Sequence, residues 1–190
     1  MFRKPIAVRD TSGRARNAGL RPPGNAQFKP RLKSCNTLTM VVNFECTTRT
    51  TTPKSELFDL ARSVDVHKDS MAQSREEVVA GVRSGLMSLG EEVTWRAWHF
   101  GVPLQMTSQI TEMQSPDYFV DEQVKGPFRR FRHVHEFRQD PAGTTMVDRI
   151  EFEAPFGAIG RLAEKLVLAR YLQRLIETRN RHLAGNSTLE

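Results

Sequence analysis

The sequence predicts an α+β fold in which a curved antiparallel sheet of about seven strands wraps around one long C-terminal helix. Three observations support this fold. A segment rich in β-branched residues opens the patterned part of the chain, a run of alternating segments separated by turn residues follows between 74 and 155, and the last segment, 157–184, has apolar residues at helical spacing. Strands joined by short turns pair antiparallel, and a curved sheet needs a helix to cover its concave face.

The N-terminal part of the chain differs from the rest in composition and charge. Residues 1–35 contain nine basic side chains and one acidic side chain, a net charge of +8, and the remainder has 19 basic and 21 acidic side chains, a net charge of −2. We therefore expect a basic disordered tail over 1–39, which binds anions weakly at most, a folded domain over 40–184 and a flexible C-terminus over 185–190. A natural start at Met40 is a second interpretation of this pattern.

The first strand is expected over 41–52, where β-branched side chains are frequent. Thr52 and Pro53 then supply an N-cap residue and a first-turn proline, which predict a short helix through 57–61. A second short helical or turn segment is expected over 64–69, so two short helices follow the first strand. Six strands fit between 74 and 155, separated by turn signals at Gly81, Gly85, Gly90, Gly101, Pro116, Gly126 and Gly143.

The final segment, 157–184, is predicted to form one amphipathic helix of roughly 42 Å, at 1.5 Å per residue. Its basic residues, which we expect on the solvated face, are Arg161, Lys165, Arg170, Arg174, Arg179 and Arg181. One helix laid across a curved sheet seldom fills the whole space between them. The geometry therefore predicts an internal, largely apolar cavity of the kind that holds small molecules.

Alternation predicts which strand residues face this cavity, because side chains of equal parity share one face of a strand. His133 and His135 share a face with two phenylalanines and oppose a row of charged residues, so we expect them inside. The same test places Trp95 and Asp148 inside and Trp98 outside. The predicted ligand-binding residues are Trp95, His99, Leu104, Met106, Ile110, Arg129, Phe131, His133, His135, Asp148, Ile150 and Phe152.

Four ionisable residues of this set are the candidate catalytic residues: His99, His133, His135 and Asp148. The preferred interpretation is structural, in which buried histidines donate to Asp148 or to carbonyl groups and hold the strands in register. A second is ligand recognition, in which His99, His133 or Arg129 meets the polar end of a bound molecule. A third is chemistry, either acid–base catalysis or a metal site built on the H-x-H pair. We predict no metal and no cofactor.

Six short segments carry a resemblance to a known superfamily. They are Gly90-Glu91-Glu92-Val93-Thr94-Trp95, His99-Phe100-Gly101-Val102, Gly126-Pro127-Phe128, His133-Val134-His135-Glu136-Phe137, Gly143-Thr144-Thr145-Met146-Val147-Asp148 and Ala154-Pro155-Phe156-Gly157. The chain resembles the START-like, or SRPBCC, superfamily of helix-grip proteins, which includes polyketide cyclases, lipid-transfer domains and the birch-pollen allergen group. It looks closest to a bacterial subgroup of generic ligand-binding domains. The resemblance implies a helix-grip ligand-binding domain on a scaffold that hosts binders, carriers and enzymes.

The expected function is binding of a small hydrophobic or amphipathic molecule, such as a lipid, a polyketide-like or an aromatic compound. The alternative is an enzyme of cyclase, dehydratase or hydrolase type that uses the His and Asp cluster. A third class is an interaction module that acts through the basic tail or docks on another protein. No apolar run approaches the roughly 18 residues of a membrane span and no signal-peptide pattern is present, so we expect a cytoplasmic protein. The charge distribution predicts no nucleic-acid partner for the folded domain, and no pattern predicts an oligomeric state.

Overall fold

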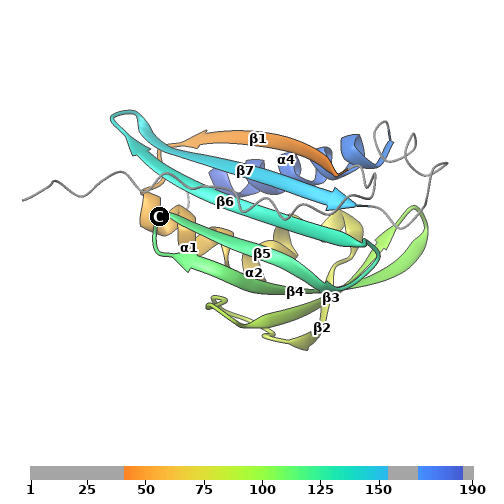
Figure 1. The fold of residues 1–190 in the computed structure, drawn as a ribbon. Helices are drawn as coiled ribbons and strands as arrows, with labels where there is room; N and C mark the ends of the chain where they lie inside the picture. Colours follow the sequence, from red (N-terminus) through yellow and green to blue (C-terminus); the bar gives the residue numbers. More distant parts are fainter. Residues whose placement is uncertain (1–40, 154–166, 186–190) are drawn as a thin grey trace, which may run out of the picture. The chain divides into compact units, whose positions relative to one another are not determined.

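The computed structural model of the protein describes residues 41–153 and 167–185, all of which belong to one unit of the chain, Leu38–Glu190. The elements in chain order are β1 (Val42–Thr50), α1 (Lys54–Ala61), α2 (Val64–Ser70), η1 (Ala72–Ser74), β2 (Glu77–Gly81), β3 (Glu92–His99), β4 (Val102–Gln114), β5 (Tyr118–Lys125), β6 (Arg130–Asp140), β7 (Gly143–Glu153) and α4 (Ala169–Gly185) (Figure 1). Three predicted parts lie outside the described residues: the tail over 1–39, the start of the C-terminal helix over 157–166 and the C-terminus from 186.

Within the described residues, the strands form one antiparallel sheet of seven strands in the order β1-β7-β6-β5-β4-β3-β2 (Figure 1). From β2 to β7, each strand pairs with the next along the chain, because short turns join them. The first strand lies beside the last, and β1 pairs with β7 from Val42↔Phe152 to Thr50↔Thr144. The predicted fold class is confirmed, including the six strands expected between 74 and 155.

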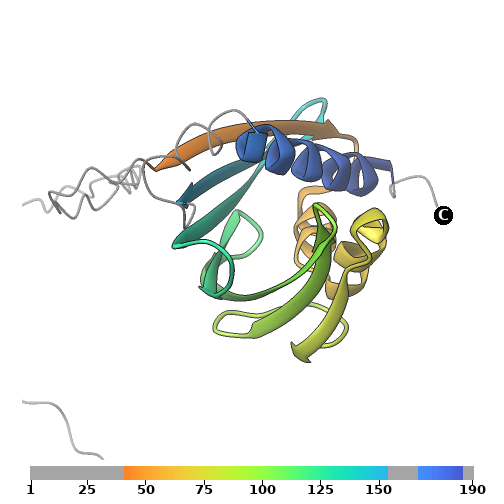
Figure 2. The same ribbon diagram turned by 90° about the vertical axis from the view of Figure 1, so that its right-hand side faces the viewer.

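The sheet curves strongly, and the helices lie on its concave side (Figure 2). α4 packs against β1 and α2, whereas α1 packs against β6 and β7. Two short helices after the first strand and a C-terminal helix are therefore present as predicted. None of the helices within 41–153 and 167–185 is long and apolar enough to cross a membrane.

The start of α1 differs from the prediction. Pro53 is the N-cap residue and makes no side-chain cap hydrogen bond. Thr52, which we expected to cap the helix, is buried instead, and its hydroxyl lies 2.8 Å from the hydroxyl of Thr50. Its carbonyl accepts a hydrogen bond of 2.6 Å from the Thr144 hydroxyl. Thr52 therefore ties the end of β1 to β7 through its carbonyl. Its own hydroxyl is buried and needs a partner, which Thr50 supplies.

Two clusters of buried apolar side chains join the sheet to the helices. In the first, Phe58 of α1 makes edge contacts with Phe119 and Phe137, with ring centroids 5.5 and 5.4 Å apart. In the second, the fully buried Phe152 packs in the same cluster as Leu172 of α4. Each such phenylalanine stabilises the fold by about 1.5–3 kcal/mol, so the two clusters hold the helices on the concave face.

Candidate functional site

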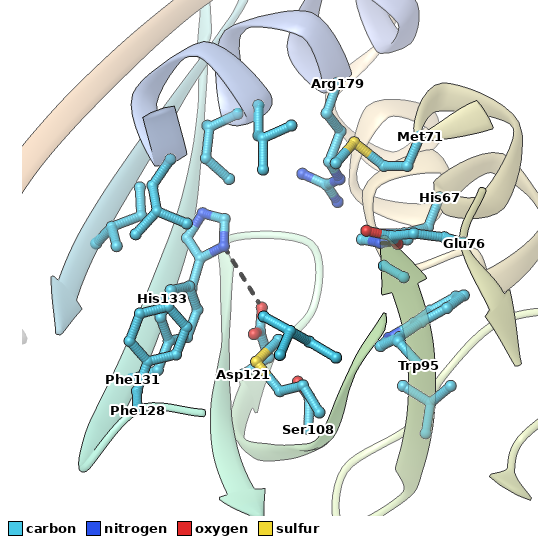
Figure 3. Close-up of a pocket in the computed structure, with 18 of the residues that line it drawn as sticks. His67, Met71, Glu76, Trp95, Ser108, Asp121, Phe128, Phe131, His133 and Arg179 are labelled. Carbon is cyan, nitrogen blue, oxygen red and sulfur yellow. Dashed lines mark hydrogen bonds and ion pairs between the residues drawn. The ribbon is translucent and has the colours of Figure 1, made fainter. Parts of the chain in front are cut away.

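A cavity of about 470 Å³ lies between the concave face of the sheet and the helices α1, α2 and α4. Its wall is mainly apolar and includes Trp95 and Ala97 of β3, Ile110 of β4, Phe131 of β6, Ile150 of β7, and Leu172 and Ile176 of α4. Polar side chains reach into the same space from three directions: His133 and Asp121 from one side, His67 and Glu76 from the opposite side, and Arg179 from α4 (Figure 3). The cavity thus combines an apolar wall with a few ionisable groups.

The hairpin between β3 and β4 forms one edge of the opening of the cavity. Phe100 and Val102 line the cavity but are 66% and 52% exposed. Phe100 has a φ of 53°, which is unusual for a bulky residue. Its ring contacts the ring of Tyr171 of α4, with centroids 4.5 Å apart. The two rings therefore connect the sheet and the helix at the opening.

Nine of the twelve residues predicted to bind a ligand line this cavity: Trp95, His99, Leu104, Met106, Ile110, Phe131, His133, His135 and Ile150. Arg129 does not, because it lies exposed just before β6, where its amide donates to the carbonyl of Glu153. Asp148 and Phe152 face inward but are fully buried behind the wall. Parity distinguishes the two faces of a strand, but it does not separate a wall residue from one packed behind the wall. Trp98 is 48% exposed on the outer face.

Asp148 is the centre of a buried ionisable cluster. Its Oδ1 accepts a hydrogen bond of 2.9 Å from Nε2 of His133, and its Oδ2 accepts one of 2.7 Å from the side-chain amide of Asn180 in α4. The same Oδ1 also lies 2.8 Å from Nδ1 of His135. One carboxylate therefore contacts both histidines.

Asp121 of β5 lies on the cavity side of the two histidines. Its Oδ2 is 3.0 Å from Nε2 of His135. The same oxygen is 3.7 Å from Nδ1 of His133, whose ring faces Asp121 in Figure 3. These three side chains each offer one donor atom, and the atoms lie within 4.8 Å of one another. The predicted group differed, because it contained His99 and Asp148 in place of Asp121. Parity could have found Asp121, since it shares its strand face with the buried Phe119.

The four ionisable groups of this cluster shift one another's pKa values. Burial opposes ionisation of Asp148 and Asp121, but hydrogen bonds and charges from the histidines outweigh it and hold the pKa of both carboxyls below the usual range. Burial also opposes charge on His135, yet its contacts with the two carboxylates raise its pKa. Burial and the charge of His135 lower the pKa of His133. These contacts favour ionised carboxylates, and they favour a proton on His135 over one on His133.

Two polar residues of α4 are buried, contrary to the prediction for one of them. Arg179, expected on the solvated face, is only 5% exposed and donates through Nη2 to the carbonyl of Ala61. Its Nη1 has no hydrogen-bond partner within the described residues, although the side chain lines the cavity. The spacing of Ile176, Arg179 and Leu183 places all three on one helix face and was the signal for this burial. The prediction was wrong because an arginine is seldom buried and was assigned to solvent for that reason.

His99 does not join the cluster. Its Nδ1 lies 2.7 Å from the hydroxyl of Tyr171, and burial lowers its pKa while the charge of Glu76 opposes the shift. Glu76 lies 2.7 Å from Nε2 of His67, whose ring stacks on Trp95 with centroids 4.4 Å apart. These side chains form a second polar region of the wall. Sequence reasoning missed His67 and Glu76, because their short segments have no clear period.

No protein-family model matches the sequence, and no curated protein matches it. Solved structures do match. The Zhui aromatase/cyclase from Streptomyces sp. R1128 is similar with a TM-score of 0.63 and 12% identity, over 77% of this chain and 93% of that one. TTHA0849 from Thermus thermophilus has a TM-score of 0.60 and 19% identity, over 78% of this chain and 100% of that one. The ginseng major latex-like protein 151 from Panax ginseng has a TM-score of 0.59 and 12% identity, over 78% and 99%.

At these identities the likeness concerns the fold. The chain has the helix-grip fold that the resemblance in the sequence implied. Because one fold hosts many functions, the function has to be argued from the cavity itself.

Proposed function

We propose that the chain binds a small, largely apolar molecule with one polar end inside this cavity. The cavity carries the proposal: its volume of about 470 Å³ lies within the range of about 300–1,000 Å³ that is usual for small-molecule sites. Apolar walls with a few convergent polar groups are also typical of such sites. The protein would act as a binder or carrier.

The polar groups suggest where the ends of the ligand lie. Trp95, Phe131 and Ile150 offer an apolar surface for its body. Arg179 offers an N–H group with no partner among the described residues, and a buried unpaired donor is costly unless a ligand accepts from it. An oxygen acceptor on a lipid, polyketide-like or aromatic compound would satisfy it.

The proposal is tested with the full chain and the fluorophore anilinonaphthalene sulfonate, which is apolar and carries one anionic group. We expect saturable binding of one probe per chain. Ala97, which is 4% exposed and lines the cavity, is replaced by phenylalanine to fill the space. Ala97→Phe should weaken probe binding at least about tenfold, because about 1.4 kcal/mol of lost contact corresponds to that factor.

The matched control is Ala80→Phe, the same change at an exposed position of β2. This variant should bind the probe like the wild type. Equal loss in both variants, or no saturable binding by the wild type, contradicts a ligand cavity.

A second candidate function is an enzyme of cyclase, dehydratase or hydrolase type. It is favoured by one observation, namely that Asp121, His133 and His135 line the cavity where a ligand would sit. The similar structure that is named as an aromatase/cyclase adds support for chemistry in this fold. The test is to extract any compound that co-purifies with the protein and to incubate it with wild type and His133→Gln. Conversion by the wild type alone would favour the enzyme, and no conversion by either would favour the binder.

A further inference from the structure

We infer that Asp121, His133 and His135 form a site for one divalent transition-metal ion in the wall of the cavity. Two imidazoles and a carboxylate are the donor set that Zn²⁺ and Fe²⁺ take in mononuclear sites. The inference goes beyond ligand binding and concerns the metal alone, so it does not depend on the identity of a ligand.

The spacing of the donor atoms suits such an ion. Ligands about 2.0–2.1 Å from a metal lie roughly 3–3.4 Å from each other in tetrahedral or octahedral geometry. Oδ2 of Asp121 lies 3.0 Å from Nε2 of His135 and 3.7 Å from Nδ1 of His133. All three atoms lie within 4.8 Å of one another. Small side-chain rotations therefore bring them to bonding distance.

Asp148 provides the outer support that metal-binding histidines usually have. It lies 2.9 Å from Nε2 of His133 and 2.8 Å from Nδ1 of His135, in each case the ring nitrogen that does not face Asp121. A carboxylate on the far nitrogen fixes the ring orientation and leaves the near nitrogen free to bind a metal. Asn180 fixes Asp148 in turn through a hydrogen bond of 2.7 Å. One fully buried residue thus orients both histidines.

The hydrogen bonds of the cluster leave one position that a metal ion can take over. An ionised Asp148 only accepts, so the ring nitrogens that face it carry the hydrogens. The nitrogens on the other side of the two rings face Oδ2 of Asp121, at 3.0 Å for His135 and 3.7 Å for His133. Without a metal, a proton bridges Nε2 of His135 and Asp121, and a metal ion displaces this proton because a ligating imidazole must be deprotonated.

The site has a free side toward the cavity. Asp121, His133 and His135 all line the cavity, whereas Asp148 lies behind them. Three protein ligands leave at least one coordination position, and metal sites that act on small molecules keep such a position open. A ligand oxygen or water in the cavity would complete the coordination.

The test uses the full chain, freed of any affinity tag and of metal by a chelator, and titrated with Co²⁺ as a coloured substitute for Zn²⁺. We expect visible absorption bands that saturate at one Co²⁺ per chain and disappear when Zn²⁺ is added. Absence of saturable bands overturns the inference, whatever the variants do.

Three variants assign the site. Asp121→Asn and His133→Gln remove ligands and should weaken Co²⁺ binding at least about 100-fold, and Asp148→Asn should weaken it about 10- to 100-fold by releasing the ring orientation. His99→Gln is the matched control, a cavity histidine outside the donor group, and it should bind Co²⁺ like the wild type. Binding retained by Asp121→Asn, or lost in His99→Gln, places the metal elsewhere and overturns the site.

Far-ultraviolet circular dichroism checks that each variant is folded. Asp121→Asn is the variant least at risk, because the Asp121 side chain is 20% exposed. Binding of anilinonaphthalene sulfonate by the same variant separates the two proposals. If the probe still binds and Co²⁺ does not, the cavity and the metal site are both supported as separate features.

Discussion

Asp148 shows how much of the site depends on one residue. Its carboxylate is fully buried, which costs free energy unless hydrogen-bond donors and opposite charges surround it. His133 and Asn180 supply the hydrogen bonds, and His135 supplies the charge. The network joins β6, β7 and α4, so it positions the cavity wall as well as the histidines.

Removing this carboxylate should destabilise the fold strongly. Asp148→Ala removes the buried partner of His133 and Asn180, and breaking a buried ionic pair in this way costs about 3–5 kcal/mol. Glu151→Ala is the control on the same strand, because Glu151 is 39% exposed and pairs with Arg130 at 3.6 Å, a contact worth less than about 1 kcal/mol. Chemical denaturation measures both free energies of unfolding. Similar losses in the two variants would show that the buried network contributes nothing beyond a surface ion pair.

His99 gives a prediction about pH. Burial lowers its pKa below the unfolded value of 6.5, so the unfolded chain binds more protons in the window below about pH 6.5. The contribution of neutral His99 to the free energy of unfolding is complete above that pH. It is lost as the pH falls toward the pKa of His99 in the folded chain. The difference in unfolding free energy between wild type and His99→Gln should therefore shrink between about pH 7 and pH 5. A difference that stays constant or grows in acid would mean that His99 is not held neutral.

At the scale of elements, the hairpin between β6 and β7 constrains the sheet edge at β1. Gly143 has a φ of 139°, and a Cβ there would lie 2.2 Å from the carbonyl oxygen of Thr50. β1 approaches the hairpin this closely because Thr50 pairs with Thr144. Only glycine combines that conformation with that approach.

A substitution at Gly143 should destabilise the protein by more than the unfavourable backbone conformation alone would. Gly143→Ala should destabilise the protein by about 3 kcal/mol or more, because backbone contact adds to the conformational strain. Gly85→Ala is the control, with a φ of 79° and nothing within 4 Å of the added Cβ, and should cost about 1–2 kcal/mol. Thermal or denaturant unfolding compares them. Equal costs would show that the close approach of β1 is not rigid.

The strands could be predicted well from the sequence, and the inward face of α4 could not. A period of two and glycines in the turns define the strands and their parity, which is why His133 and His135 were expected inside. On α4, by contrast, Arg179 and Asn180 occupy core positions, and the hydrophobic pattern counts polar residues as solvated. Their burial depends on partners in other elements, Ala61 and Asp148, which a helical pattern does not contain.

At the scale of the whole molecule, the fold class could be predicted but the grouping of site residues could not. Element order and a long C-terminal helical pattern imply a curved sheet covered by a helix. Which inward residues meet depends on strand stagger and sheet curvature, and those bring Asp121 to His135 while His99 meets Tyr171. Parity assigns a face, whereas neighbours on that face depend on the three-dimensional register.

The central claim is that the cavity holds a small apolar molecule, and native mass spectrometry of the purified full chain tests it most directly. The wild type should carry one non-covalent compound per chain, removable by organic solvent, and Ala97→Phe should carry little or none because its added ring fills the cavity. Metal analysis of the same sample reports on Asp121, His133 and His135 independently. A wild type that is empty and also takes up no anilinonaphthalene sulfonate would contradict the account. Full retention of the compound by Ala97→Phe would contradict it as well.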